Sequence, residues 1–421
     1  MHKTHNLLGI PMLTVKRTTT LIALTALAFL FLSSCENPET GSLYDPNYTS
    51  PRPQPTIASL APKSGLAGVT TITIAGTNFS SVKAENTVYF DAKQAEVLTA
   101  SPTQLTVKAP NLAKDSIKIR VSVFGALLFS NTALCKLDAA VAEFGQLGGT
   151  DEAWGTTTDA AGNLYASLVT DGNGMGIKKF TAAGVKSDYA PSGGVTKWSS
   201  LKMGPSGELY LARILRAIYK IPAGGGPAAI WLSFGNLGTV FDMDFDQSKV
   251  LWAGGNNTSV YRIKQDKDVK AFPFAANVRA VRVYGNYAYF GGLVTADNAE
   301  KVVRFKIVTP DSLGAQEEYF NLTASSLGGA GKSIFAINFN VDGDMYVGTD
   351  ATDPIIIVHP DKSAEALHPG VLSPAMHIFA SGTGSVLYAV KGVPSSGVVS
   401  TSGKIFKINP LKTLAPYYGP Q

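Results

Sequence analysis

Short runs of alternating apolar and polar residues, separated by turn-forming residues, cover most of the chain from about residue 55 onward. In the first 80 or so of these residues the runs lie at 69–74, 87–90, 105–108 and 117–124, and none has the 3.6-residue period of an amphipathic helix. Alternation with period two places successive side chains on opposite faces of a strand. This region is therefore predicted to form a sandwich of about seven short β-strands.

Four segments of this region resemble the IPT/TIG family of immunoglobulin-like (E-set) domains: PTIASLAP at 55–62, SG at 64–65, TITIAGTNF at 71–79 and VKAP at 107–110. The resemblance covers residues 55–138 and implies a structural role for the Gly-Thr-Asn-Phe segment. We therefore expect a special backbone angle at Gly76 and a core position for Phe79. Cys135 is expected to be a small buried residue.

From 139 to 421 one phrase recurs: an aromatic residue, an alternating strand, a Gly/Asp/Asn turn, and a second strand that begins with a hydrophobic and an aromatic residue. These second-strand aromatics recur at intervals of 37 to 57 residues and are Tyr165, Tyr210, Trp252, Tyr289, Tyr346 and Tyr388. An all-β repeat of about 42 residues is typical of a four-stranded propeller blade. The copies, such as GNLY at 162–165 followed by IKKF at 177–180, resemble NHL-type repeats. The chain is thus predicted to be all-β, with the immunoglobulin-like domain followed by a six-bladed β-propeller.

Two segments are candidates for the outer strand of the sixth blade. Residues 141–144 precede the first copy, residues 413–418 follow the last one, and both have the pattern of a strand. The ring must close, because an open one exposes two terminal faces. We expect one segment to complete the sixth blade and the other to lie against or near it.

The N-terminus has the pattern of an export signal. Lys16 and Arg17 precede an apolar run at 21–32, which is too short to span a membrane and ends in Leu32-Ser-Ser-Cys35. This ending resembles a bacterial lipobox, which implies that residues 1–34 are removed and that Cys35 is acylated. A signal peptide that merely contains a cysteine is the alternative. The proline-rich residues 35–54 predict an extended tether, and the expected location is the bacterial outer membrane, at the cell surface.

Composition narrows the possible functions. The chain of 421 residues has 36 Lys and Arg against 31 Asp and Glu, and the net charge of +5 is too small to indicate nucleic-acid binding. With 2 cysteines there is neither a disulfide scaffold nor a cysteine-based zinc cluster. The 5 histidines lack metal-binding spacing, and no Walker loop or Gly-x-Ser-x-Gly elbow occurs. No catalytic residue, metal or cofactor is therefore predicted.

The innermost strand of each predicted blade should direct alternate side chains toward the centre of the ring. By this register a polar funnel is predicted from Lys202, Asp242, Asp244, Arg282 and Asn338. Its opposite charges favour ion pairs over a divalent cation. Aromatic faces beside polar groups suit sugar rings, and the aromatic residues that begin innermost strands are Trp154, Trp198, Phe241 and His377. Packing between blades is the alternative role for these aromatic residues.

The predicted order of segments, which is a lipid anchor, a tether, an IPT/TIG-like domain and a propeller, resembles that of non-catalytic surface lipoproteins of Bacteroidetes-type bacteria. Some of these proteins capture glycans beside an outer-membrane importer. The resemblance implies a monomer that binds a polysaccharide, an oligosaccharide or a protein through its propeller face, with the IPT/TIG domain as a spacer. Its expected partners are the membrane and an outer-membrane transporter. The alternatives are a lactonase-type hydrolase or a lyase acting in the central channel, and a structural or adhesive envelope protein.

Overall fold

The computed structural model describes residues 49–420, except 214, 237, 396 and 397. The predicted signal (1–34), Cys35 and most of the predicted tether (35–54) lie outside the described residues. The described part is all-β apart from one short 3-10 helix, η1 (Lys83–Glu85). Within it, no helix has the length and the apolar character needed to cross a membrane.

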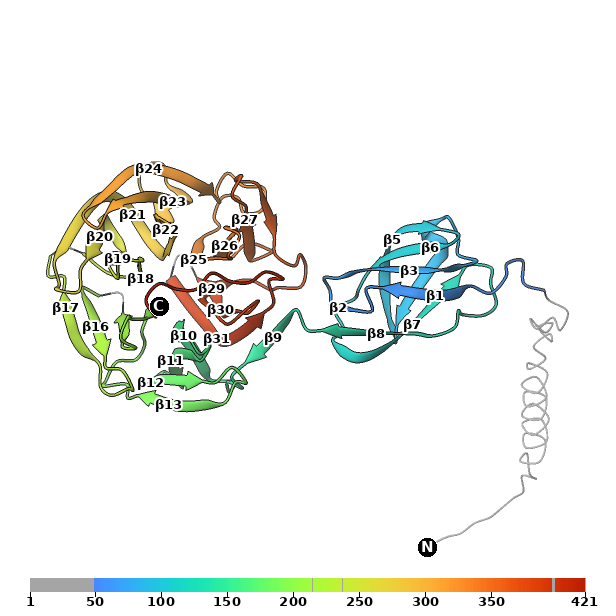
Figure 1. The fold of residues 1–421 in the computed structure, drawn as a ribbon, viewed down its shortest axis with the longest axis horizontal. Coiled ribbons are helices and arrows are strands. Elements are labelled where there is room, and N and C mark those ends of the chain that lie inside the picture. The colour runs from blue at the N-terminus through green and yellow to red at the C-terminus, as the bar shows by residue number, and fades with distance from the viewer. Residues whose placement is uncertain (1–48, 214, 237, 396–397, 421) are drawn as a thin grey trace, which may run out of the picture. The chain divides into compact units, whose positions relative to one another are not determined.

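The first eight strands form an immunoglobulin-like sandwich. They are β1 (Thr56–Ala61), β2 (Ser64–Leu66), β3 (Thr71–Thr77), β4 (Asn86–Phe90), β5 (Lys93–Ser101), β6 (Gln104–Lys108), β7 (Lys114–Val123) and β8 (Ala133–Asp138). Their order is β1-β3-β6-β5-β4-β7-β8-β2, and all pairs are antiparallel except the parallel pair β2–β8 (Figure 1). Alternation decides what is buried: on β7 the side chains of 117, 119, 121 and 123 enter the core and those between them face outward.

The resemblance to IPT/TIG domains predicted three local features of this sandwich, and two of them are confirmed. Phe79 is buried in the core, and so is Cys135. Gly76 differs from the prediction, because the left-handed backbone angle belongs to Asn78, with φ of 62°. Glycine is required at 76 for space instead, since a Cβ there would lie 1.9 Å from the carbonyl oxygen of Thr56.

The remaining strands form five sheets. Four are four-stranded: β10 (Asp151–Thr158), β11 (Leu164–Thr170), β12 (Asn173–Phe180) and β13 (Lys186–Ala190); β14 (Ser200–Met203), β15 (Leu209–Ala212), β16 (Ala217–Ile221) and β17 (Ala229–Ser233); β25 (Ile334–Phe339), β26 (Met345–Thr349), β27 (Ile355–Val358) and β28 (Ala364–Ala366); and β29 (Met376–Ser381), β30 (Leu387–Ser395), β31 (Val398–Ile408) and β9 (Val141–Phe144). Figure 1 shows the sheets following one another around a ring, which is a propeller-like arrangement.

The fifth sheet has seven strands because one long strand serves both of its halves. It contains β18 (Asp242–Phe245), β19 (Leu251–Gly254), β20 (Asn256–Ile263), β21 (Val269–Tyr284), β22 (Tyr287–Val294), β23 (Ala299–Thr309) and β24 (Ser312–Asn321). The first half of β21 pairs with β20, from Val269 to Asn277, and its second half pairs with β22, from Ala276 to Tyr284.

The ring closes through its N-terminal strand. β9 pairs with β31 over Val141–Phe144, so this segment is the outer strand of the last sheet. The other candidate, at 413–418, joins no sheet edge; it makes a single bridge between Leu414 and Asn340. Pairing between the two ends of the repeat region fixes the ring, and β9 covers the edge that β31 would otherwise expose.

The recurrent second-strand aromatics pack between neighbouring sheets. All of them are buried, with exposed fractions of 4% or less for Tyr165, Tyr210, Trp252, Tyr289, Tyr346 and Tyr388. The ring of Tyr210 on β15, for example, meets that of Phe245 on β18 edge to face, with centroids 5.1 Å apart. Each sheet thus buries its faces against the next, as expected for repeats that are not stable alone.

Candidate functional site

The side chains at the centre of the ring come from its innermost strands, but a simple period of two does not select all of them. β10, β21, β25 and β29 each contain a register shift close to the centre. As a result Arg279 and Arg282, three positions apart, both take part in central contacts. In β29 Ser381 rather than Ala380 makes the polar contacts. A bulge adds one residue to a strand and so reverses the alternation beyond it.

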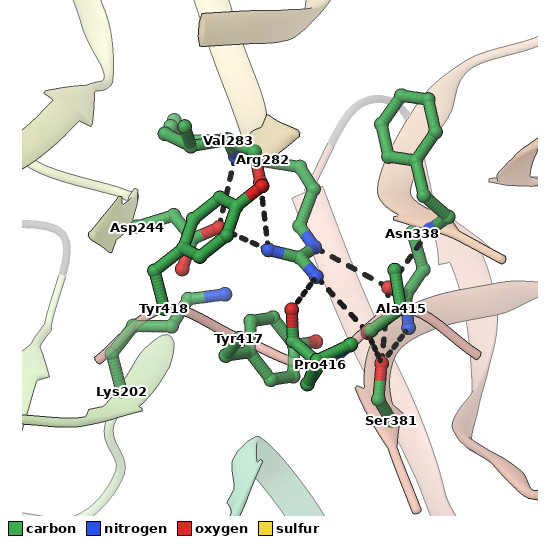
Figure 2. Close-up of polar contacts among 12 residues, drawn as sticks. Lys202, Asp244, Arg282, Val283, Asn338, Ser381, Ala415, Pro416, Tyr417 and Tyr418 are labelled. Carbon is green, nitrogen blue, oxygen red and sulfur yellow. Dashed lines mark hydrogen bonds and ion pairs between the residues drawn. The ribbon is translucent and has the colours of Figure 1, made fainter. Parts of the chain in front are cut away.

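A buried polar network lies around Arg282. Its Nη1 atom donates to Asp244 Oδ2 at 2.8 Å, and its Nε atom donates to Asn338 Oδ1 at 3.3 Å (Figure 2). The same carboxylate oxygen of Asp244 accepts the backbone N–H of Val283 at 2.9 Å. Arg282 and Asn338 are fully buried, and Asp244 is 1% exposed. Three predicted funnel residues therefore come together, but as partners of one another inside the protein.

The C-terminal segment, residues 413–420, completes this network. Arg282 Nη2 donates to the carbonyl oxygens of Ala415 and Pro416 at 3.2 and 3.0 Å (Figure 2). The Arg282 guanidinium also lies 4.1 Å from the ring centroid of Tyr417, whose hydroxyl donates to the carbonyl of Phe379 at 3.2 Å. Burial raises the pKa of Tyr417. The segment fills this side of the centre, so the predicted funnel is not open here.

Lys202 lies between the C-terminal segment and a small cavity. Its Nζ atom is 4.9 Å from the ring centroid of Tyr417 and 3.8 Å from Asp242 Oδ1. Burial opposes the charge of Lys202, but the neighbouring acidic groups, Asp242 first among them, raise its pKa above the usual value. Lys202 is therefore a buried cation, and Asp242 is held in turn by Ser200 Oγ at 2.5 Å and the Val281 N–H at 2.8 Å.

This cavity, which we call the central pocket, has a volume of about 20 Å³, or room for about one water molecule. It is lined by Thr156, Ser199, Ser200, Lys202, Phe241, Asp242, Arg279, Phe335, Ala336, Ile337, His377, Ile378 and Phe379. Two of these residues contain buried polar atoms without a hydrogen-bond partner among the described residues: Oγ1 of Thr156 and both ring nitrogens of His377. Buried polar groups are usually paired, so a water molecule or a polar group of a ligand in the pocket would satisfy these atoms.

His377 packs as an aromatic ring while it lines the pocket. Its ring centroid is 4.3 Å from that of Phe335 on the neighbouring sheet. Burial lowers the pKa of His377 to about 4, so the ring is neutral at pH 7 and has one nitrogen that donates and one that accepts. The His377 ring therefore packs between sheets, which was the alternative role predicted from the sequence, and it also lines the central pocket.

Sequence reasoning missed the carboxylate beside Arg279. Glu300, on β23, pairs with Arg279 Nη2 through both of its oxygens and accepts the Ile334 N–H at 2.9 Å. Arg279 Nε donates to the Ile334 carbonyl at 2.8 Å. The predicted centre contained no glutamate, because Glu300 lies outside the innermost strands. The strand also contains Lys301, Arg304 and Lys306, so no local pattern singled out Glu300.

The predicted aromatic surface is mostly closed. Trp198 is 1% exposed and meets Tyr219 edge to face, so it offers no open ring to a ligand. Trp154 is 4% exposed and packs with Val169 and Phe335, with Lys197 Nζ 3.7 Å from its ring centroid. Phe241 is half-buried and is the one predicted aromatic besides His377 that lines the central pocket. The physical reason is that large aromatic rings at equivalent repeat positions fill the space between sheets.

The described residues include no group of three or more His, Cys, Asp or Glu side chains that could hold a metal ion. The charged side chains at the centre are instead arranged as pairs: Lys202 with Asp242, Arg279 with Glu300, and Arg282 with Asp244. Chemically, the central pocket offers two cationic side chains, one carboxylate, hydroxyl groups, a neutral imidazole and apolar rings to a group that enters it.

Comparison with known families identifies the first domain. Residues 55–136 match the family described as the IPT/TIG domain, which confirms the resemblance seen in the sequence. No curated protein matches the chain.

Solved structures with similar folds include an auxiliary nutrient binding protein from Bacteroides thetaiotaomicron, which is 14% identical, has a TM-score of 0.51, and matches over 87% of this chain and 98% of that one. An auxiliary nutrient binding protein from Bacteroides ovatus is 12% identical, with a TM-score of 0.46 and coverage of 85% and 98%. Virginiamycin B lyase from Staphylococcus aureus is 14% identical, with a TM-score of 0.44 and coverage of 71% and 93%. At these identities the likeness concerns the fold alone.

Replacing Arg282 with methionine should destabilise the protein strongly. The change leaves the Asp244 carboxylate buried without its ion-pair partner, and we expect the free energy of unfolding to fall by about 3–5 kcal/mol. The same replacement at Arg216, which is exposed, should change it by less than about 0.5 kcal/mol. Chemical denaturation measures both variants, and equal losses at the two positions would contradict the role given to Arg282.

His377 should make the protein less stable in acid. Its pKa is about 4 when folded and 6.5 ordinarily, so protonation favours the unfolded chain, and stability present above pH 6.5 is lost as the pH falls toward 4. The loss attributable to this residue is about 3 kcal/mol. The gap in unfolding free energy between wild type and His377→Gln should therefore change by about that amount between pH 7 and pH 4. A gap independent of pH would show that His377 is not held neutral.

Proposed function

We propose that this protein is a non-catalytic, lipid-anchored protein of the bacterial cell surface that binds a glycan at the central pocket. The observation that carries the proposal is the pair of buried residues, Thr156 and His377, which line the pocket and contain polar atoms without a partner among the described residues. Leaving such atoms unpaired costs free energy, which a bound polar group would recover. The fold likeness to a Bacteroides thetaiotaomicron auxiliary nutrient binding protein agrees with a binding role.

The chemistry of the pocket favours an uncharged hydroxyl over an anion. The charges of Lys202 and Arg279 are balanced by those of Asp242 and Glu300. A neutral histidine and a threonine hydroxyl can each donate and accept, which matches a group that does both. The small volume admits one such group rather than a whole ring. The ligand is therefore expected to insert a protruding hydroxyl or chain end, with Phe241 beside it.

Catalysis is disfavoured by the state of His377. A general base works best when its pKa lies near the working pH, and burial lowers the pKa of this histidine to about 4. Asp242 is already held by Ser200 and by the Val281 N–H. The pocket is therefore better suited to binding than to a lactonase, hydrolase or lyase reaction.

The repeat count supports a closed ring of six blades, related to NHL-type propellers. We count the seven-stranded sheet as two blades that share β21, because its two halves pair with different neighbours. The other four sheets supply one blade each. The immunoglobulin-like domain then serves as a spacer between the tether and the propeller, and an outer-membrane transporter is the proposed partner.

A threonine-to-valine change tests the ligand site. Thr156→Val removes a hydroxyl that has no partner, so stability should be unchanged or slightly higher, while glycan binding should weaken about tenfold. The full chain and the variant are compared on a glycan array and then by calorimetry with the best ligand. Thr71→Val, at an exposed position of the first domain, is the matched control. Retention of no glycan, or retention that Thr156→Val leaves unchanged, would refute the site.

Acylation is tested separately in cells. Cys35→Ala should abolish incorporation of labelled palmitate and move the protein from the membrane fraction to the soluble one, because several acyl chains on one cysteine supply stable anchoring. Cys135→Ala is the control, since Cys135 is buried in the first domain and should leave labelling unchanged. Labelling that survives Cys35→Ala would rule out this anchor.

A further inference from the structure

A loop between β7 and β8 exposes an unusual set of large apolar side chains. Its sequence at 124–129 is Phe-Gly-Ala-Leu-Leu-Phe. The side chains of Phe124, Leu127 and Leu128 are 77%, 63% and 61% exposed. Val82, on the segment next to it, is 52% exposed. Single exposed apolar residues are common, but several together on one loop mark an interaction surface.

The fold holds this loop in a defined shape. The Phe124 N–H donates to the Glu85 carbonyl at 2.8 Å, and the Ala126 N–H donates to the Val123 carbonyl at 2.9 Å. At the far end the ring of Phe129 lies against the sheet, 5.8 Å from the ring of Tyr89 and 5.0 Å from the Arg120 guanidinium. The two ends are thus fixed, and the apolar side chains between them project from a tight turn.

The loop lies at the end of the domain where the chain enters from the tether. Gln54 Nε2 donates to the Phe129 carbonyl at 2.6 Å, and the Gln54 carbonyl accepts from Asn78 Nδ2 at 2.8 Å. Gln54 is only 19 positions after Cys35, a distance of at most about 65 Å when extended. A membrane that holds Cys35 is therefore within reach of this end of the domain.

The geometry points to the lipid bilayer as the occupant of this surface: the side chains of Phe124, Leu127 and Leu128 insert into the interfacial layer of the membrane. Exposed basic side chains border them, Lys83 on η1 and Arg120 on β7. Apolar side chains flanked by Lys and Arg are typical of surfaces that bind at a lipid interface. The inference rests on the proposed lipid anchor only for bringing the loop to a membrane.

Vesicle flotation of the full chain with Cys35→Ala tests the loop without acylation. We expect this chain to float with vesicles of phosphatidylcholine and phosphatidylglycerol. Adding Leu127→Ser and Leu128→Ser should weaken the partitioning roughly tenfold or more, because two large apolar side chains are lost from the interface. The control adds Ile230→Ser and Val308→Ser, at residues with exposed fractions of 61% and 60% on β17 and β23, and should float like the parent. Vesicles of phosphatidylcholine alone should bind more weakly, because Lys83 and Arg120 then lack anionic partners.

Each of three results would overturn the inference: no flotation of the Cys35→Ala chain, flotation that the loop substitutions leave unchanged, or a dimer in solution that these substitutions dissociate while vesicles bind nothing. The last would assign the loop to a second copy of the chain. Failure here is distinct from failure of the proposed function, because palmitate labelling and glycan retention are measured on chains with an intact loop. Equal melting temperatures of the parent and the loop variant would exclude unfolding as the cause.

Discussion

A guanidinium buried at the centre of a ring needs several partners at once, and Arg282 obtains them from three directions. Asp244 comes from β18, Asn338 from β25, and the carbonyls of Ala415 and Pro416 from the C-terminal segment. Removing any one of them leaves charge or polar atoms unpaired in a place that water does not reach freely. This requirement holds the C-terminal segment at the centre, where it covers the buried Arg282.

The polar groups around Arg282 and those around the central pocket therefore have different roles, although the innermost strands supply both. Except for Asp244 Oδ1, the donors and acceptors around Arg282 are paired within the protein, which is typical of groups that stabilise one arrangement of the core. Around the central pocket, Arg279 and Asp242 are paired, but Thr156 and His377 are not. A change around Arg282 should act mainly on stability, and a change around the central pocket should act mainly on binding.

The repeat of buried aromatics such as Tyr210 and Trp252 could be predicted from the sequence, because each aromatic ring must fill the space between two sheets. The strands of the first domain could also be predicted. The register at the centre could be predicted only where strands are regular. Lys202 and Asp242, which were expected to face the centre, line the central pocket, whereas bulges shifted the alternation in β10 and β29. Glu300 and Tyr417 were missed, because they reach the centre through tertiary packing and not through any local pattern.

Keeping two polar residues unpaired in a buried pocket lowers stability, by about 1–3 kcal/mol for each group. A valine at 156 and an apolar ring at 377 would bury no unpaired polar atom, and the neighbours of His377 are Phe335 and the backbone at Gly392. Polar side chains at both positions are therefore in agreement with the proposed interaction. The ion pairs nearby supply the rigidity that such a site needs, because Lys202–Asp242 joins β14 to β18 and Arg282–Asp244 joins β18 to β21.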